Sequence, residues 1–189
     1  MYPSENLDTE DYYDQECSWW HTDERGEVYR NRIRKINGRS YAFDGIGRMQ
    51  TGFVLFDEKS EFVARYEVDD WSSEDFIEGT IYGIEKSDLY LFSPDELNDG
   101  SMQIGEDIAV ELEDGVFHFG FASNGKAFGN RNRLQKKEGM YYINGLRLEA
   151  DEEYGYGVVK VEDGADTYYQ VVDTRGKVIE GKKKIVKDK

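Results

Sequence analysis

The feature that most constrains this chain is a repeat. Five times, a short aromatic string is followed by a turn glycine, and a second Gly or Asn comes five residues after that glycine. A repeat of this kind decides the fold class before any single element does, because one supersecondary unit is copied along the chain. The copies are Trp19-Trp20 with Gly26 and Asn31, Tyr41-Ala42-Phe43 with Gly47 and Gly52, Tyr90-Leu91-Phe92 with Gly100 and Gly105, Phe117-His118-Phe119 with Gly125 and Asn130, and Tyr168-Tyr169 with Gly176 and Gly181.

The strings themselves predict strands rather than helices. Aromatic and β-branched residues fill positions 41–43, 89–92, 116–121, 140–143 and 167–172, each bounded by Gly, Asn or Asp. With 20 glycines and only 2 prolines, the connections favour hairpin turns that need positive φ. A lone hairpin buries too little apolar surface to be stable, so each unit must stack on its neighbours. The sequence therefore predicts an all-β fold, a repeat β-hairpin solenoid.

Several segments depart from the repeat. Residues 56–86 break the rhythm and predict one irregular insertion, with a strand over 62–68 and a capping box between Ser72 and Asp75 over one helical turn. A shortened sixth unit covers 140–150, with a tight turn at Asn144-Gly145. We expect an acidic, flexible N-terminal arm at 1–16, the repeats at 17–181 and a basic tail at 182–189.

Charge restricts the partners. The 189 residues carry a formal net charge of -16, which disfavours nucleic acid because like charges repel. Any polyanion contact would be limited to Arg30, Arg32, Arg34 and Lys35 and to the basic tail, whose alternative role is to keep the end soluble. The longest apolar run, Phe53 to Phe56, predicts no membrane insertion.

Catalytic, redox and metal chemistry have little support. Cys17 is alone, so an internal disulfide is excluded, and with His21 and His118 it forms no zinc-ligand spacing. Neither histidine stands beside a Ser or Cys in a recognisable nucleophile motif. A calcium-loop pattern from Asp95 to Glu106 has Leu97 where a carboxylate belongs. We therefore predict no enzyme activity, no metal and no cofactor.

The unit at 36–53 resembles the cell-wall-binding repeat family of Gram-positive surface proteins, which includes the choline-binding and glucan-binding repeats. The match is strongest there, and Asp99 to Gly105 and Glu138 to Gly145 repeat its turn half and strand half. The resemblance implies a β-solenoid of stacked hairpins, secreted or attached to the cell surface and usually joined to another module. The matching positions are Asn37, Gly38, Tyr41, Phe43, Asp44, Gly47, Met49, Thr51 and Gly52.

In the choline binders, three aromatics from consecutive repeats enclose a quaternary ammonium by cation–π attraction of about 0.5–2 kcal/mol per ring. Here the Trp that follows the second Gly is Phe53 in one unit, Glu106 in another, and then Arg131 and Lys182, so most cages lack a wall. The alternative is that the aromatics pack between hairpins. The predicted ligand-binding aromatics are Trp19, Trp20, Tyr41, Phe43, Phe53, Tyr90, Phe92, Phe117, Phe119, Tyr141, Tyr142, Tyr168 and Tyr169.

The sequence thus predicts a non-catalytic repeat module that binds the cell envelope or a polysaccharide, with cell-wall polymer, including choline-bearing polymer, as partner. The resemblance implies an extracellular or cell-surface location, although the first residues do not read as a signal peptide. The alternative is a protein-interaction or spacer module that docks a partner chain through the acidic insertion at 56–86.

Overall fold

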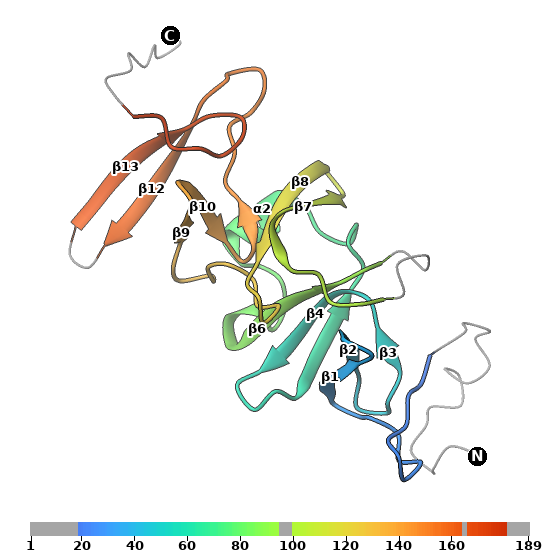
Figure 1. Ribbon diagram of the computed structural model, residues 1–189. Coiled ribbons are helices and arrows are strands. Elements are labelled where there is room, and N and C mark those ends of the chain that lie inside the picture. The colour runs from blue at the N-terminus through green and yellow to red at the C-terminus, as the bar shows by residue number, and fades with distance from the viewer. Residues whose placement is uncertain (1–18, 95–99, 164–165, 181–189) are drawn as a thin grey trace. The chain divides into compact units, whose positions relative to one another are not determined.

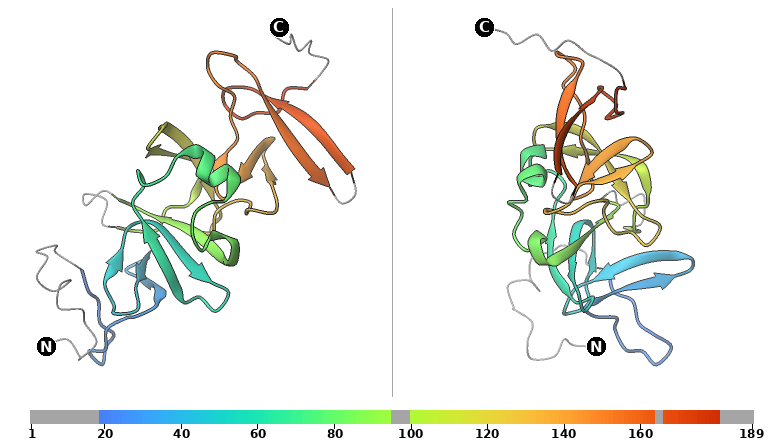
Figure 2. Two further views of the ribbon diagram at one scale, coloured as in Figure 1. Left: turned by 180° about the vertical axis from the view of Figure 1, so that it is seen from behind. Right: turned by 90° about the vertical axis from the view of Figure 1, so that its left-hand side faces the viewer.

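The fold is all-β with one short helix. The structure is a computed structural model that describes residues 19–94, 100–163 and 166–180 (Figure 1). Within these residues the chain forms thirteen strands, the helix α2 at Ser73–Glu78 and the 3-10 turn η1 at Ile84–Lys86. The helix is the green coil in both views of Figure 2. Antiparallel pairing joins all the strand neighbours, as expected for a chain of hairpins.

The chain divides into two compact units that are discontinuous in sequence. Unit 1 comprises Met1–Asp70 and Tyr82–Gln103, and unit 2 comprises Trp71–Ile81 and Ile104–Lys189. The short segment 71–81, which carries α2, therefore belongs to unit 2 although unit 1 residues flank it on both sides.

Unit 1 holds two three-stranded sheets, ordered β1-β2-β3 and β5-β4-β6. Strands β4 and β6 pair directly, Gly52 opposite Phe92, although 39 residues separate those two positions. The apolar core includes Val54, Phe56 and Tyr90, with ring pairs such as Phe56–Tyr90 at 5.8 Å. The strands are β1 Arg32–Ile36, β2 Arg39–Phe43, β3 Met49–Gln50, β4 Gly52–Asp57, β5 Phe62–Tyr66 and β6 Ser87–Phe92.

Unit 2 holds a five-stranded sheet, β7-β8-β11-β10-β9, and the two-stranded β12-β13 hairpin. Phe76 of α2 is fully buried and meets Phe119 edge-on at 5.0 Å. Tyr141 packs with valines of the β12-β13 hairpin in a second cluster. The strands are β7 Gly105–Leu112, β8 Gly115–Phe121, β9 Gln135–Lys137, β10 Met140–Ile143, β11 Leu146–Arg147, β12 Gly157–Asp163 and β13 Asp166–Val172.

One five-residue turn recurs in both units. Its first residue is usually Asp, whose carboxylate accepts backbone N–H groups two and four positions later, as Asp23 does from Arg25 and Glu27. Its fourth residue has positive φ, which favours glycine because glycine has no Cβ to clash. The turns are 23–27, 44–48, 57–61, 122–126 and 173–177, with φ of 81° at Gly26, 98° at Gly47, 64° at Ser60, 83° at Gly125 and 75° at Gly176.

Successive hairpins interlock at these turns. A Cβ on Gly47 would lie 2.4 Å from Cγ1 of Val28, which is the residue two positions after the preceding turn glycine. In the same way, Gly100 packs on Met49 and Gly176 packs on Arg147. Glycine is needed at these positions because the preceding hairpin leaves no space for a side chain.

Backbone hydrogen bonds repeat the same offset. The amide two residues after the turn glycine donates to the residue that begins the preceding hairpin, at 2.8 to 2.9 Å. These bonds run from Met49 to Trp19, from Met102 to Ser40 and from Val178 to Gly139. Such bonds join successive hairpins within each unit.

The segment 56–86 is ordered by local chemistry at its centre. Ser72 precedes α2, and the Asp75 carboxylate accepts hydrogen bonds from the Ser72 amide at 3.0 Å and its hydroxyl at 2.7 Å. Gly79 ends the helix in the left-handed conformation at φ 67°. The capping box predicted from Ser72 and Asp75 is confirmed, as is a strand from Phe62.

The predicted strands at 41–43, 89–92, 116–121, 140–143 and 167–172 are all confirmed, as is the tight turn at Asn144-Gly145. One prediction is wrong: Trp19 and Trp20 form no strand, and the first copy contributes only an isolated bridge between Thr22 and Val28. The turn without glycine at 57–61 escaped the sequence pattern because Ser60 adopts the positive φ there. The expected arm, the basic tail and Gly181 lie outside the described residues.

Candidate functional site

The thirteen aromatics predicted to bind ligand separate by burial. Seven are packed in the cores and leave at most 7% of their surface exposed, so a ligand has no access to them in this conformation. Tyr41 and Phe117 are half-buried. Four remain exposed, namely Trp19 at 72%, Trp20 at 44%, Tyr168 at 40% and Tyr169 at 67%. The buried ones are Phe43, Phe53, Tyr90, Phe92, Phe119, Tyr141 and Tyr142.

The first exposed group lies at the first hairpin of unit 1. Trp19 and Trp20 precede His21, whose ring stacks on Tyr29 with centroids 5.4 Å apart and an interplanar angle of 9°. The guanidinium of Arg34 lies over the same Tyr29 ring at 5.2 Å. The Tyr29 ring therefore already makes a cation–π contact within the chain, whereas the two tryptophan side chains are exposed to solvent.

The second exposed group lies on the β12-β13 hairpin of unit 2. Tyr168 stands opposite Val161 and Tyr169 opposite Lys160, and directly paired residues share a face of the sheet. Tyr168 therefore lies on the face that holds buried Val161, and Tyr169 lies on the opposite face with exposed Val158. The two neighbouring tyrosines present their rings to different sides.

Sequence reasoning missed two exposed tyrosines beside this hairpin. Tyr154 is 62% exposed and Tyr156 is 37% exposed, just before β12. They escaped the repeat pattern because they do not begin a strand, but their alternation with Gly155, at φ 68°, is a turn signal that could have identified them. Unit 2 thus exposes four tyrosines close together in sequence.

Buried Tyr141 shows how the inner face is held. Its hydroxyl donates to Oε1 of Gln170 at 2.8 Å, and the ammonium of Lys136 lies over its ring at 5.2 Å. As at Tyr29, a cation of the chain takes the position that a ligand cation would need.

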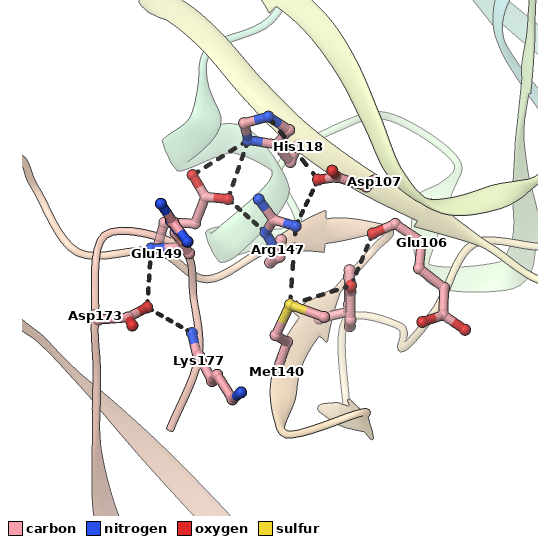
Figure 3. Close-up of polar contacts among 10 residues, drawn as sticks. Glu106, Asp107, His118, Met140, Arg147, Glu149, Asp173 and Lys177 are labelled. Carbon is pink, nitrogen blue, oxygen red and sulfur yellow. Dashed lines mark hydrogen bonds and ion pairs between the residues drawn. The ribbon is translucent and has the colours of Figure 1, made fainter. Parts of the chain in front are cut away.

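Polar side chains from four strands and a following segment meet in an ion-pair cluster around the buried Arg147 (Figure 3), in which Asp107 is exposed. Arg147, only 8% exposed, donates from Nε to Glu149 at 2.5 Å and from Nη1 to Asp107 at 2.7 Å. His118 approaches the same two carboxylates, with Nδ1 3.1 Å from Oε1 of Glu149 and Nε2 3.9 Å from Oδ1 of Asp107. One arginine and one imidazole thus share two carboxylates.

A β-bulge places Asp107 in this cluster. The register between β7 and β8 shifts between Gly105 and Ile108, so the strand turns Asp107 toward Arg147 (Figure 3). Tyr142 supports the bulge, since its hydroxyl donates to the Glu106 carbonyl at 2.9 Å. The cluster joins residues 40 positions apart in the chain, which suits a structural role.

Electrostatics in the cluster are balanced internally. Burial alone would lower the pKa of Arg147, but hydrogen bonds and charge attraction from Glu149 and Asp107 outweigh it and hold this pKa above its ordinary value. Burial raises the pKa of the Tyr142 phenol, and the Arg147 charge offsets part of that rise. Each charge of the cluster thus already has a partner within the chain.

Metal binding finds no support in the described part of the chain. Among residues 19–94, 100–163 and 166–180, no group of three or more His, Cys, Asp or Glu side chains is placed to hold an ion. The calcium-loop pattern falls largely on 95–99, outside the described residues. Among those same described residues, no helix has the length and apolar character to cross a bilayer.

No protein-family model matches this sequence, and no curated protein matches it. Among solved structures, CbpJ from Streptococcus pneumoniae TIGR4 is similar at 16% identity and a TM-score of 0.42, covering 86% of this chain and 60% of that one. The modular Cpl-1 endolysin complexed with a peptidoglycan analogue is similar at 15% identity and a TM-score of 0.34, covering 87% and 37%. Choline binding protein F from Streptococcus pneumoniae is similar at 16% identity and a TM-score of 0.27, covering 86% and 44%.

The chain is thus similar to choline-binding repeat proteins, the group its sequence pattern resembles. It spans between 37% and 60% of the length of these solved chains.

Proposed function

We propose that this chain is a non-catalytic binding module of a bacterial surface or secreted protein, which attaches to cell-envelope polymer or polysaccharide outside the cell. The observation that carries the proposal is the division of its aromatics. Most are buried between hairpins, while Trp19, Trp20, Tyr168 and Tyr169 keep 40 to 72% of their surface exposed. Large exposed rings on an ordered β scaffold are typical of binding surfaces.

The proposal includes the predicted repeat β-hairpin solenoid with one insertion. It is supported within unit 1 by Gly47 packing on Val28, and within unit 2 by Gly176 packing on Arg147. A scaffold of this kind repeats its surface at regular intervals, and this suits a polymer with a repeating structure.

The binding mechanism follows from the ring chemistry. The flat faces of Trp and Tyr offer apolar area to the C–H face of a sugar ring, and they attract a quaternary ammonium such as choline by cation–π interaction. Arg34 over Tyr29 and Lys136 over Tyr141 already occupy two further rings. We assign the contacts with sugar or choline groups to Trp19, Trp20, Tyr168 and Tyr169, the exposed members of the predicted set.

Retention on purified Gram-positive cell walls, with a glycan array and choline titration in parallel, tests the proposal. The variants Trp19→Ala/Trp20→Ala and Tyr168→Ala/Tyr169→Ala should each weaken retention by roughly fivefold to tenfold, since each pair removes two ring contacts. Tyr82→Ala is the matched control, because Tyr82 is 77% exposed but lies outside the predicted set.

Saturable binding that these pairs weaken and Tyr82→Ala leaves unchanged would support the proposal. Absence of retention above an unrelated acidic protein, with no choline or glycan binding by the folded chain, would reject it. The predicted docking of a partner chain through 56–86 stays a prediction. Phe76, Ile81 and Ile84 of that segment are at most 3% exposed, whereas Ile77 and Tyr82 are exposed.

A further inference from the structure

The β1-β2 hairpin has a charge opposite to that of the protein. Residues 28–43 contain five Arg and Lys side chains and no Asp or Glu, in a chain of net charge -16. Such a reversal concentrates positive potential on one hairpin, where it attracts anions despite the repulsion of the remainder. The cations are Arg30, Arg32, Arg34, Lys35 and Arg39.

The strand register places three of these arginines on one face. Arg32 pairs with Phe43, Arg34 with Tyr41 and Ile36 with Arg39, so Arg32, Arg34 and Arg39 share a side of the hairpin. Arg32 and Arg34 are exposed and stand two residues apart, which is about 6.8 Å along an antiparallel strand.

The opposite face of the hairpin is fixed in the core. Ile33 packs against the cluster that contains Ala42, Val54 and Phe92, and Ala42 is fully buried. Phe43, directly opposite Arg32, is buried as well, so both sides are packed at this end of the hairpin, while Arg32 and Arg34 themselves stay exposed. The cationic face is therefore held in place by the fold.

Within the described residues, Arg30, Arg32, Arg34 and Lys35 form no ion pair with a carboxylate, whereas Arg48, Arg65 and Arg147 each do. Arg32 Nε donates instead to the Arg30 carbonyl at 2.9 Å, and Arg34 lies over the Tyr29 ring. Within the described residues, these four cations thus carry positive charge that no carboxylate neutralises through an ion pair.

We propose that the β1-β2 hairpin binds the phosphate groups of a phosphodiester-linked envelope polymer, with Arg32 and Arg34 contacting successive charges. This inference rests on the proposed function and adds the charge class of the polymer. Arginine suits this task because its planar guanidinium binds phosphate oxygens through two hydrogen bonds and stays charged. A single-stranded phosphodiester polymer is favoured over duplex nucleic acid, which carries one charge per about 1.7 Å of helix axis, because only one narrow hairpin is basic and the net charge of -16 repels the denser polyanion.

The test measures binding of the full chain to soluble poly(glycerol phosphate), with uncharged dextran and single-stranded DNA as comparison ligands, across salt concentrations. The test variant is Arg32→Gln/Arg34→Gln. The matched control is Lys59→Gln/Lys86→Gln, which removes the same charge from two exposed positions of unit 1. Circular dichroism and thermal unfolding check that both variants are folded, and Arg32→Lys/Arg34→Lys keeps the charge.

We expect binding to poly(glycerol phosphate) that weakens with salt, a loss of about fivefold to tenfold in Arg32→Gln/Arg34→Gln, and a salt dependence whose logarithmic slope is shallower by about 1.4, or about 0.7 for each arginine removed. The lysine control should lose less than about twofold, and the arginine-to-lysine variant should retain part of the binding. Equal loss in both charge-removing pairs would overturn the assignment to this hairpin.

Absence of polymer binding, or equal or tighter binding of single-stranded DNA, would also overturn the inference. Its failure differs from failure of the proposed function. If Arg32→Gln/Arg34→Gln keeps full retention on cell walls while the exposed-aromatic variants lose it, the module binds envelope polymer without a phosphate site on this hairpin. If the unmodified chain is not retained on walls but binds poly(glycerol phosphate), the phosphate site on the hairpin is supported and the proposed attachment to the cell envelope is rejected.

Discussion

The first and second turns of unit 1 have the same backbone design but different surroundings. In both, an Asp carboxylate accepts backbone N–H groups and the fourth residue is a glycine at positive φ, 81° at Gly26 and 98° at Gly47. A Cβ on Gly26 would meet nothing within 4 Å, whereas one on Gly47 would meet Val28 at 2.4 Å. The comparison shows that the local sequence is enough to form either turn. Packing against the preceding hairpin then determines how much stability is lost when the turn glycine is replaced.

The largest loss of stability is expected from the residue on which the last turn glycine packs. Arg147→Ala removes the side chain beside Gly176 and leaves Glu149 partly buried without its arginine, so it should lower the free energy of unfolding by about 3–5 kcal/mol. Urea denaturation measures this, with Arg133→Ala as an exposed control in the same unit. A loss below about 1 kcal/mol would show that the cluster in Figure 3 contributes little.

The comparison itself is tested by Gly47→Ala and Gly26→Ala. Each variant forces alanine into the left-handed region, which costs about 1–2 kcal/mol, but only Gly47→Ala adds a clash of about 1–3 kcal/mol. We expect losses near 3 kcal/mol for Gly47 and about 1 kcal/mol for Gly26, measured by urea denaturation. Equal losses would mean that the second turn is not supported by the first hairpin.

The turn carboxylates should follow the same order with smaller effects. Asp44, 5% exposed, accepts from Ile46, Gly47 and Arg48 amides and from the Gln50 side chain, so Asp44→Ala should cost about 2 kcal/mol. Asp23 serves an exposed turn, and Asp23→Ala should cost about 0.5–1 kcal/mol. Thermal unfolding of the two variants measures these losses. A larger loss for Asp44→Ala would show that burial of the carboxylate sets the loss of stability, and equal losses would show that the turn motif alone sets it.

The smallest effect is expected at Asp75 in the helix cap, whose side-chain hydrogen-bond partners Ser72 and Thr80 are local in sequence. Hydrogen bonds from Thr80 and Ser72 hold the pKa of Asp75 below its ordinary value of 3.8. A lowered folded-state pKa gives stability that is full above the ordinary value and is lost as pH falls through the folded-state value. The urea midpoint of the unmodified chain should therefore fall more than that of Asp75→Asn between about pH 5 and pH 2. Parallel curves would contradict this.

Local patterns predicted the parts of the fold that local physics determines. The strands at 116–121 and 140–143, the Asn144-Gly145 turn and the Ser72-Asp75 cap depend on residues within a few positions, and all are present. Successive side chains of a strand point to opposite faces of the sheet, but the sequence does not show which of the two faces another hairpin covers. For this reason Phe43 and Tyr142 were predicted as ligand contacts and are buried.

Long-range contacts could not be predicted from one sequence. The pairing of β4 with β6 bypasses β5, α2 and η1, and nothing in either strand specifies that partner. The cluster around Arg147 needs Asp107 and His118 from other strands, and with 40 acidic residues in the chain no spacing singles out Asp107. Trp19 and Trp20 were predicted as a strand but form none, although the Trp19 carbonyl accepts a backbone hydrogen bond from the distant Met49.

The membership of segment 71–81 has a consequence for synthesis on the ribosome. Unit 1 can be completed once residue 103 has emerged, but Phe76 and Ser73 must wait for Phe119 and for Asp114, which accepts hydrogen bonds from the Ser73 amide and hydroxyl. Asn144 then adds a bond from its side chain to the Phe76 carbonyl, 68 residues away in sequence. A nascent chain stopped after residue 103 would therefore leave Phe76 of α2 exposed. A chaperone that binds this residue would contact a part of unit 2 before the remainder of unit 2 has been synthesised.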